Sequence, residues 1–249
     1  MDSSLAREAR TAVRCGRPRR EFAGEVEERI LEAAAKVFLE RGFEGASIDE
    51  IAEKARAGKP TIYVRFPSKE ALFTAVMARN LRKNIAALEG LAATGSTTEE
   101  RLSALATGIL ERALASDSVG LMRSAVAEAR RFPDLAGSVH RMARERGNEA
   151  IAQLLSEFAK SDEMSALPAF APDRLPATAR RFKELILLPI VVRALFGEDL
   201  AELRAEIGPH VVQSVAFFLA ACRYEGGDPV RAGRRDGYAT TLPRQEAGR

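Results

Sequence analysis

Cysteine, histidine and tryptophan are scarce in this chain of 249 residues. It has two cysteines, Cys15 and Cys222 near opposite ends, two histidines, and no tryptophan. So few thiols and imidazoles exclude a disulfide framework, argue against a zinc site and fit a reducing cytoplasm. We therefore expect a cytoplasmic protein that holds no metal and no other cofactor.

Long apolar segments are also missing. The longest uninterrupted run, Leu185 to Val192, is far shorter than the ~20 residues that a membrane-spanning helix needs. The N-terminus carries Asp2, Glu8 and several arginines with no apolar segment behind them, which is not the pattern of a secretory signal. The sequence thus predicts no contact with a membrane.

Aromatic residues make up only 6% of the chain, whereas Ala, Leu, Arg and Glu are abundant. This composition favours helix over sheet, so the expected fold class is all-α. Hydrophobic residues amount to 46% and charged residues to 29%, which suffices for a sizeable core and excludes a wholly disordered chain. The length allows one large domain or two of ordinary size.

The net charge of +3 is small, but its distribution is uneven. Residues 1–83 hold 17 Lys and Arg against 13 Asp and Glu, and the remaining residues hold 21 against 22. Between Arg7 and Arg20, six arginines stand against the single Glu8. A nucleic-acid contact needs such a local positive region. A solvated, disordered tail is an equally open interpretation.

Apolar residues recur at spacings of three and four, which predicts helices almost throughout. Ser47 to Glu50 and Thr97 to Glu100 are capping boxes, in which a hydroxyl and a carboxylate each accept from a backbone amide. Gly42 stands where a left-handed stop to the first helix is expected. The predicted helices cover 22–41, a short stretch from Ile48, 59–65, Ser68 to about 91, Thr97 to about 115, 118–131, 134–160, 176–196 and 199–222, the last broken near Gly208 and Pro209, with a loop over 161–176.

Two of these helices are short and joined by a tight turn, which is typical of a helix-turn-helix. Their apolar residues can form a shared core against the first helix: Ile48, Ile51, Ala55, Ile62 and Phe66 against Val37 and Phe38. The second short helix then exposes a mixture of hydrogen-bond donors and small apolar groups, which can meet phosphates and major-groove base edges together. These exposed residues are Lys59, Thr61, Tyr63, Val64 and Arg65.

The chain resembles the N-terminal domain of TetR-family transcriptional regulators over about residues 25–75. The segments that carry the resemblance are Arg29 to Ala34, Phe38 with Gly42-Phe43, Ser47 to Ala52, Lys59 to Tyr63, and Phe66 to Phe73. A further segment, Glu128 to Leu135, is similar to one branch of the family. The resemblance implies a basic arm over 1–21, a DNA-binding domain over 22–68, a helical regulatory and dimerisation domain over 69–223, and a tail over 224–249.

The same resemblance implies roles at the DNA. Ser47, Thr61, Tyr63 and Lys69 match positions that touch phosphates. The groove-facing positions are Lys59, Thr61, Val64 and Arg65. Arg17 and Arg19 of the basic arm are candidates for a minor-groove contact. The sequence departs from the family pattern at Arg56 and at Gly58, which supplies no hydroxyl.

The family also places a homodimer interface on the last two long helices, at Leu185, Leu188, Val191, Leu195, Val211, Val215, Phe218 and Leu219. A fully internal helix pair is the alternative. Helices before this pair would enclose an effector site whose apolar candidates are Leu102, Leu105, Ile109, Met122, Val126, Met142, Ile151 and Leu155. His140 either meets a polar ligand or lies on a surface turn.

The expected function is sequence-specific DNA binding by a homodimer at a palindromic operator. By family analogy a small, partly apolar ligand tilts the fourth helix, separates the two reading heads and releases a repressor. Activation is an alternative outcome, and a helical ligand carrier or a nonspecific architectural DNA binder are alternative classes. An enzyme lacks support, because the sequence has no metal-ligand cluster, no Gly-rich phosphate loop and no nucleophile beside a histidine.

Overall fold

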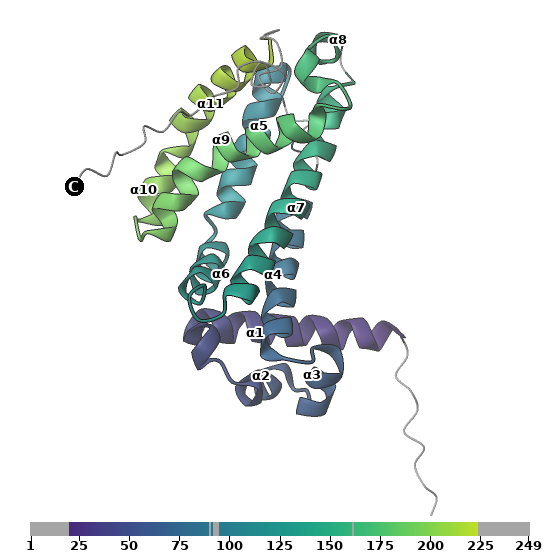
Figure 1. Ribbon diagram of the computed structural model, residues 1–249, viewed down its shortest axis with the longest axis vertical. Helices are drawn as coiled ribbons and strands as arrows, with labels where there is room; N and C mark the ends of the chain where they lie inside the picture. The colour runs from purple at the N-terminus through teal and green to yellow at the C-terminus, as the bar shows by residue number, and fades with distance from the viewer. Residues whose placement is uncertain (1–19, 90, 92–94, 161, 224–249) are drawn as a thin grey trace, which may run out of the picture. The chain divides into compact units, whose positions relative to one another are not determined.

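The computed structural model describes residues 20–89, 91, 95–160 and 162–223. Every regular element in these ranges is helical, which confirms the all-α prediction (Figure 1). The elements are α1 (Arg20–Gly45), α2 (Ile48–Ala55), α3 (Lys59–Arg65), α4 (Lys69–Ala86), α5 (Thr98–Ala113), α6 (Ser116–Ala127), α7 (Pro133–Phe158), α8 (Asp162–Ser165), a 3-10 turn at Pro168–Phe170, α9 (Leu175–Leu195), α10 (Leu200–Ala205) and α11 (Ile207–Cys222).

The chain forms two compact units. Of the described residues, the first unit comprises 20–87 together with Arg112–Gly147 and Ala194–Leu200. The second unit comprises the described residues within Leu88–Glu111, Asn148–Arg193 and 201–223. The three helices of the predicted DNA-binding domain therefore share a unit with α4, α6 and the first part of α7.

Aromatic rings form the centre of the first unit. The Phe73 ring of α4 meets the rings of Phe38 and Phe43 edge-on, at centroid distances of 5.0 and 5.2 Å. Such edge-to-face pairs add about 0.5–1.5 kcal/mol each beyond the burial of their area. The predicted helix-turn-helix core is confirmed around them, with Ile48 partly buried and the remaining members buried: Val37, Phe38, Ile51, Ala55, Ile62 and Phe66.

Two backbone positions with positive φ shape this core. Gly42 has φ 70°, where the path of α1 breaks as the sequence predicts, and glycine adopts this φ without steric cost. Arg56 has φ 49° and ends α2 in the left-handed conformation. Among the described residues, it is the one non-glycine residue with positive φ. The family pattern from which Arg56 departs has glycine in this turn, which matches the conformation seen.

Several helix limits differ from the prediction. The fourth helix ends at Ala86 instead of near residue 91. The break in the last predicted helix falls at Glu206, because Pro209 sits in the first turn of α11, where a missing amide proton costs nothing. The predicted loop over 161–176 contains α8 and a 3-10 turn, whose Phe170 is buried and lies 6.4 Å from the Phe218 ring.

In the second unit, a histidine of α11 contacts α9 close to a proline within that helix. Pro189 lies inside α9, where its ring interrupts the helical hydrogen bonds. The Nε2 atom of His210 lies 3.0 Å from the carbonyl oxygen of Ile186, one turn before the proline. A carbonyl only accepts, so Nε2 carries the proton in this contact. The Phe182 and Phe218 rings pack 4.9 Å apart in the same unit.

Candidate DNA-binding site

Helix α3 buries one face and exposes the other. Ile62 is fully buried and Phe66 nearly so, whereas Tyr63 is 48% exposed and Val64 is 84% exposed. Gly58 begins the helix without a side-chain cap, and Pro60 occupies the first turn, where it needs no amide donor. The helix thus presents a phenol hydroxyl and an isopropyl group to its surroundings on a firmly packed base.

The charged groups around this face have partners within the protein. The Lys59 ammonium forms an ion pair with the Asp49 carboxylate in the first turn of α2. Arg65 is half-buried, and its Nη1 donates to the carbonyl oxygen of Thr61 at 3.2 Å. Sequence reasoning missed Asp49, because its side chain lies on α2 and only the fold brings it to Lys59.

Ser47 caps α2, but the predicted capping box is only half formed. The Glu50 amide donates to Ser47 Oγ at 3.1 Å. The Glu50 carboxylate pairs instead with Lys54 at 3.4 Å and with Arg41 at 3.8 Å. Nearby cations therefore replace the Ser47 amide as its partner. At Thr97 the box is complete, since Glu100 N donates to Thr97 Oγ1 at 3.1 Å and Thr97 N to Glu100 Oε2 at 3.2 Å.

Lys69 begins α4 and points back to the end of α1. Its Nζ donates to the carbonyl oxygens of Glu44 and Ala46, at 3.0 and 3.1 Å. The same ammonium lies 4.8 Å from the centroid of the Phe43 ring. Ser68 caps the helix through the Ala71 amide at 3.2 Å. The remaining candidates for DNA contact, Arg17 and Arg19, lie outside the described residues.

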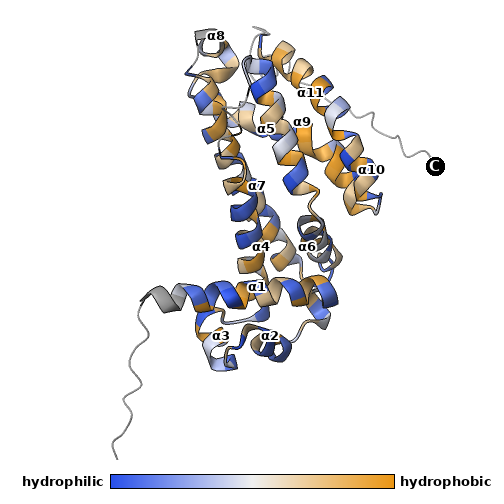
Figure 2. Cartoon of the chain, turned by 180° about the vertical axis from the view of Figure 1, so that it is seen from behind, coloured by the Kyte–Doolittle hydropathy of each residue, from blue (hydrophilic) through white to orange (hydrophobic). Residues whose placement is uncertain are grey.

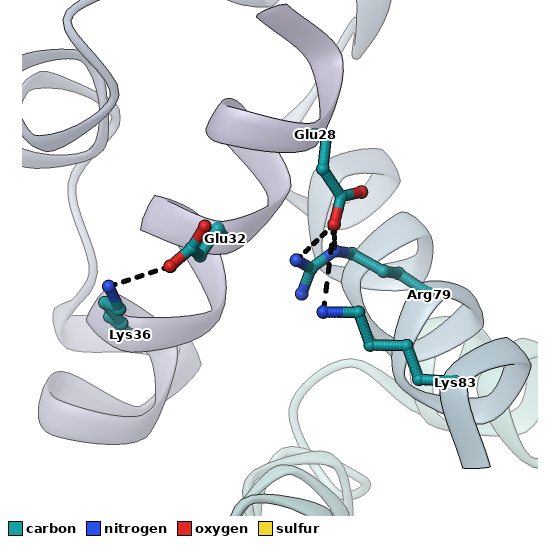
Figure 3. Close-up of polar contacts among 5 residues, drawn as sticks. All are labelled: Glu28, Glu32, Lys36, Arg79 and Lys83. Carbon is teal, nitrogen blue, oxygen red and sulfur yellow. Dashed lines mark hydrogen bonds and ion pairs between the residues drawn. The ribbon is translucent and has the colours of Figure 1, made fainter. Parts of the chain in front are cut away.

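Ion pairs fasten α1 to α4 on another side of the first unit (Figure 3). Arg79 Nε donates to Glu28 Oε1 at 2.7 Å, and its Nη2 contacts the same oxygen. Lys83 lies 3.8 Å from this carboxylate, and Lys36 pairs with Glu32 along α1 at 3.0 Å. The hydrogen bond from Arg79 holds the pKa of Glu28 below its ordinary value.

A hydroxyl links α4 to α6. Ser118 is buried, and its Oγ accepts from the side-chain amides of Asn80 at 3.2 Å and Asn84 at 3.0 Å. Asn80 and Asn84 are adjacent in sequence to the two α4 cations that contact Glu28. Helix α4 is thus bonded to α1 by residues 79 and 83 and to α6 by residues 80 and 84.

The predicted dimer residues separate into two groups. Leu188 is 56% exposed, and Leu185, Val191 and Leu195 are partly exposed. The four on α11, namely Val211, Val215, Phe218 and Leu219, are buried within the protomer. Because their own chain covers these four side chains, we expect other residues of α11 to meet a second copy. Sequence reasoning also missed several exposed apolar residues, namely Val192, Phe196, Val212 and Phe217.

In Figure 2, α11 is coloured as hydrophobic along most of its length, so its composition does not separate the inner face from the outer face. A helix that is apolar on both sides gives no periodic signal to tell its inner face from its outer face. The buried residues Val211, Val215 and Phe218 follow spacings of four and three, and the exposed Val212 and Phe217 add apolar residues outside that stripe.

The effector candidates are spread over both units. Leu102, Leu105 and Ile109 of α5 and Ile151 and Leu155 of α7 are buried in the second unit. In the first unit, Met122 and Met142 are partly buried, whereas Val126 is 61% exposed and His140 is exposed. Such exposure does not suit the wall of an enclosed apolar site. His140 lies on α7, not on a turn.

Comparison with known families separates the chain into two matched regions. Residues 30–76 match the model of bacterial regulatory proteins of the tetR family. Residues 100–224, half of the chain, match the C-terminal domain of AefR-like transcriptional repressors. The chain belongs to the TetR family. Members of this family are DNA-binding transcriptional regulators, and the exposed face of α3 belongs to the helix-turn-helix of this one.

Curated TetR-family relatives match mainly the N-terminal part. The transcriptional activator FasR of Mycolicibacterium smegmatis is 36% identical over 87 residues, which are 35% of this chain and 38% of FasR. The transcriptional repressor SCO4008 of Streptomyces coelicolor is 43% identical over 53 residues, 21% of this chain and 28% of SCO4008. The chain thus aligns with less than half the length of these relatives.

Solved structures match most of the chain. A TetR-family transcriptional regulator of Mesorhizobium loti has a TM-score of 0.65 and 25% identity, with 80% of this chain and 97% of that chain covered. The flavonoid-responsive regulator FrrA has a TM-score of 0.59 and 29% identity, with 82% and 100% covered. Within the described ranges, this TetR-family chain has no helix long and apolar enough to span a membrane.

Proposed function

We propose that this protein is a homodimeric transcriptional repressor that binds a palindromic operator through α2 and α3 and leaves it when a small ligand binds. The observation that carries the proposal is the exposed face of α3, which combines Tyr63 and Val64 on a buried core of Ile62 and Phe66. A packed helix with such a face fits a DNA major groove. We assign the protein no enzymatic activity and place it in the cytoplasm, with the DNA.

Neutral hydroxyls would hold the phosphates. Tyr63, Thr61 and Ser47 supply O–H donors, and phosphate contacts of this kind fix the orientation of a protein on DNA. Val64 would meet a thymine methyl group, since an apolar side chain reads that group in the major groove. One N–H of Arg65 donates to the carbonyl oxygen of Thr61. The other four N–H groups of its guanidinium would be able to donate to a guanine edge. Lys59 would exchange Asp49 for the DNA.

A dimer would bring two copies of this face to one duplex. The exposed apolar residues Leu188 and Val192 of α9 and Val212 and Phe217 of α11 all lie in the second unit. Exposed apolar residues on two long helices favour burial against a second copy. Two reading helices then need half-sites ~34–36 Å apart, or a multiple of that spacing.

The ligand would be small and partly apolar. The buried candidates on α5 and α7 are aliphatic, and such side chains line sites for ligands of this class. FrrA, similar in fold, responds to a flavonoid according to its name. Repression is favoured because the matched C-terminal model is that of a transcriptional repressor. Activation is the alternative, since FasR is an activator.

The test is selection of binding sites from a random pool of duplexes with the full chain. We expect a palindromic consensus, and we expect a screen of small molecules, flavonoids included, to release the selected duplex. Arg65→Ala should relax the preference at particular base pairs, whereas Tyr63→Ala should weaken binding to all duplexes alike. Equal affinity for selected and random duplexes would instead favour an architectural DNA binder.

A further inference from the structure

Lys69 is engaged by the protein itself at the point where the family resemblance implies a phosphate contact. An ammonium has three N–H donors. Two of them go to the backbone oxygens of Glu44 and Ala46, and the Phe43 ring lies beneath the charge. Lys69 is half-buried. A phosphate oxygen would therefore have to share the one remaining N–H or displace a carbonyl.

The two carbonyls belong to the turn over residues 43–46, between the Gly42 break in α1 and the Ser47 cap of α2. Carbonyls at the end of a helix have no partners further along it, and the negative end of the helix dipole favours a cation there. Lys69 supplies both a donor and a charge. Ala46 directly precedes Ser47, so the Lys69 contact fixes the start of α2.

The same turn is held from a second side. Arg131 forms an ion pair with the Glu44 carboxylate, and the Phe132 ring lies edge-on to the Phe43 ring at 5.3 Å. Arg131 and Phe132 lie between α6 and α7, in the segment 128–135 that the sequence singled out. Lys69 thus bonds the backbone of the turn over 43–46, and Arg131 and Phe132 contact its side chains.

We propose that Lys69 is a positioning residue, which holds the turn over 43–46 so that Ser47 can cap α2 and present its hydroxyl to a phosphate. It acts on DNA through Ser47 and is not itself the phosphate ligand. The inference rests on the proposed operator binding by α2 and α3. It differs from the role that the resemblance implies for this lysine.

The decisive experiment is a double-mutant cycle on the full chain with the duplex selected by the wild-type protein. Lys69→Met keeps the alkyl stem over Phe43 and removes the donors. We expect it to weaken operator binding about tenfold in the wild-type background and less than about twofold in a Ser47→Ala background, because residues in one network do not act additively. The matched control is Lys59→Met, an exposed lysine on α3.

The salt dependence separates positioning from direct contact. A lysine that neutralises a phosphate contributes about 0.9 to the slope of log affinity against log salt. We expect Lys59→Met to lower the slope by about this amount and Lys69→Met to leave it nearly unchanged. A loss of about one in the Lys69→Met slope, with equal effects in both backgrounds, would overturn the proposal and restore the direct contact.

Amide hydrogen exchange gives a readout without DNA. The Glu50 amide is bonded to Ser47 Oγ, so its protection should fall in Lys69→Met and stay unchanged in Lys59→Met. If Lys69→Met does not fold, Lys69→Gln takes its place in the same measurements, because its shorter and neutral side chain lacks the ammonium that donates to Glu44 and Ala46. Unchanged Glu50 protection in the folded variant counts against positioning. Failure to select any duplex would overturn the proposed function itself, and the exchange result would still decide the role of Lys69.

Discussion

The outer faces of α3 and α11 differ in the polarity of their exposed side chains. Both helices bury apolar side chains on the inner side, such as Ile62 on α3 and Val215 on α11. The outer face of α3 adds hydroxyls and charges to Val64, which water can hydrate. The outer face of α11 carries Val212 and Phe217, the latter 67% exposed. A polar face is hydrated when it is free and so suits a partner that binds and leaves, such as DNA. An apolar face is stabilised by burial and so favours a partner that stays bound.

Neighbouring phenylalanines on α11 test this contrast most strongly. Phe218 packs against Phe182, so Phe218→Ala should lower the free energy of unfolding by about 3–5 kcal/mol. Phe217→Ala should change it by less than about 0.5 kcal/mol in dilute, monomeric protein. Urea denaturation at low protein concentration measures the free energy of unfolding of both variants. Equal losses would mean that the two faces of α11 are not distinct.

A charge on the outer face of α11 should break the dimer. We expect Phe217→Glu to sediment as a monomer at concentrations where the parent protein is a dimer. Operator affinity should fall on the order of 100-fold, because two linked reading heads gain at least this much over one. Gln153→Glu adds the same charge at an exposed position on α7 and should sediment as the parent does. A monomeric parent protein would contradict the assignment of this face.

The outer face of α3 should bear changes without loss of stability. Tyr63→Phe removes one hydroxyl, so we expect operator affinity to fall about five- to tenfold, the loss of about one hydrogen bond. The melting temperature and the salt slope should not change, because the lost group is exposed and neutral. A lowered melting temperature would indicate that Tyr63 serves packing instead.

The left-handed Arg56 predicts a gain in stability. A non-glycine residue in this conformation costs roughly 1–2 kcal/mol, part of which glycine offsets by its greater freedom in the unfolded chain. Arg56→Gly should therefore raise the free energy of unfolding by about 0.5–1 kcal/mol. Thermal denaturation of Arg56→Gly tests the positive φ of this residue. Arg41→Gly is the control, because glycine at this helical position should lower stability.

The smallest effect concerns acid. Because Arg79 lowers the pKa of Glu28 in the folded protein, this carboxylate contributes stability above its ordinary pKa, and the contribution fades as the pH falls through the folded value. Glu28→Gln should thus be less stable than the parent at pH 7 and should converge with it in acid. A constant difference between the two proteins from pH 7 to pH 3 would contradict this.

Sequence predicted the elements whose signals are local. The limits of α3, the start of α2 at the Ser47 cap and the complete capping box at Thr97 depend on residues within one turn of each other. Turn and capping residues act at fixed offsets, so their consequence can be read without knowing the rest of the fold.

Features set by distant contacts escaped prediction. The carboxylate of Glu50 pairs with Arg41 of α1. The ammonium of Lys69 donates to the carbonyls of Glu44 and Ala46. On α11, Phe218 packs against Phe170 and Phe182. Each of these choices depends on which elements the fold brings together. The core of the helix-turn-helix was predictable because a short helix with few apolar residues has only one way to bury them.

His210 has a consequence for how two protomers meet. Pro189 supplies no N–H to the preceding turn of α9, and its ring crowds the carbonyl of Leu185, which weakens the helical hydrogen bonds around it. Here the imidazole of the same protomer occupies the Ile186 oxygen. If a second copy packs on this face, the Ile186 carbonyl already has a partner within its own protomer and needs none from the other.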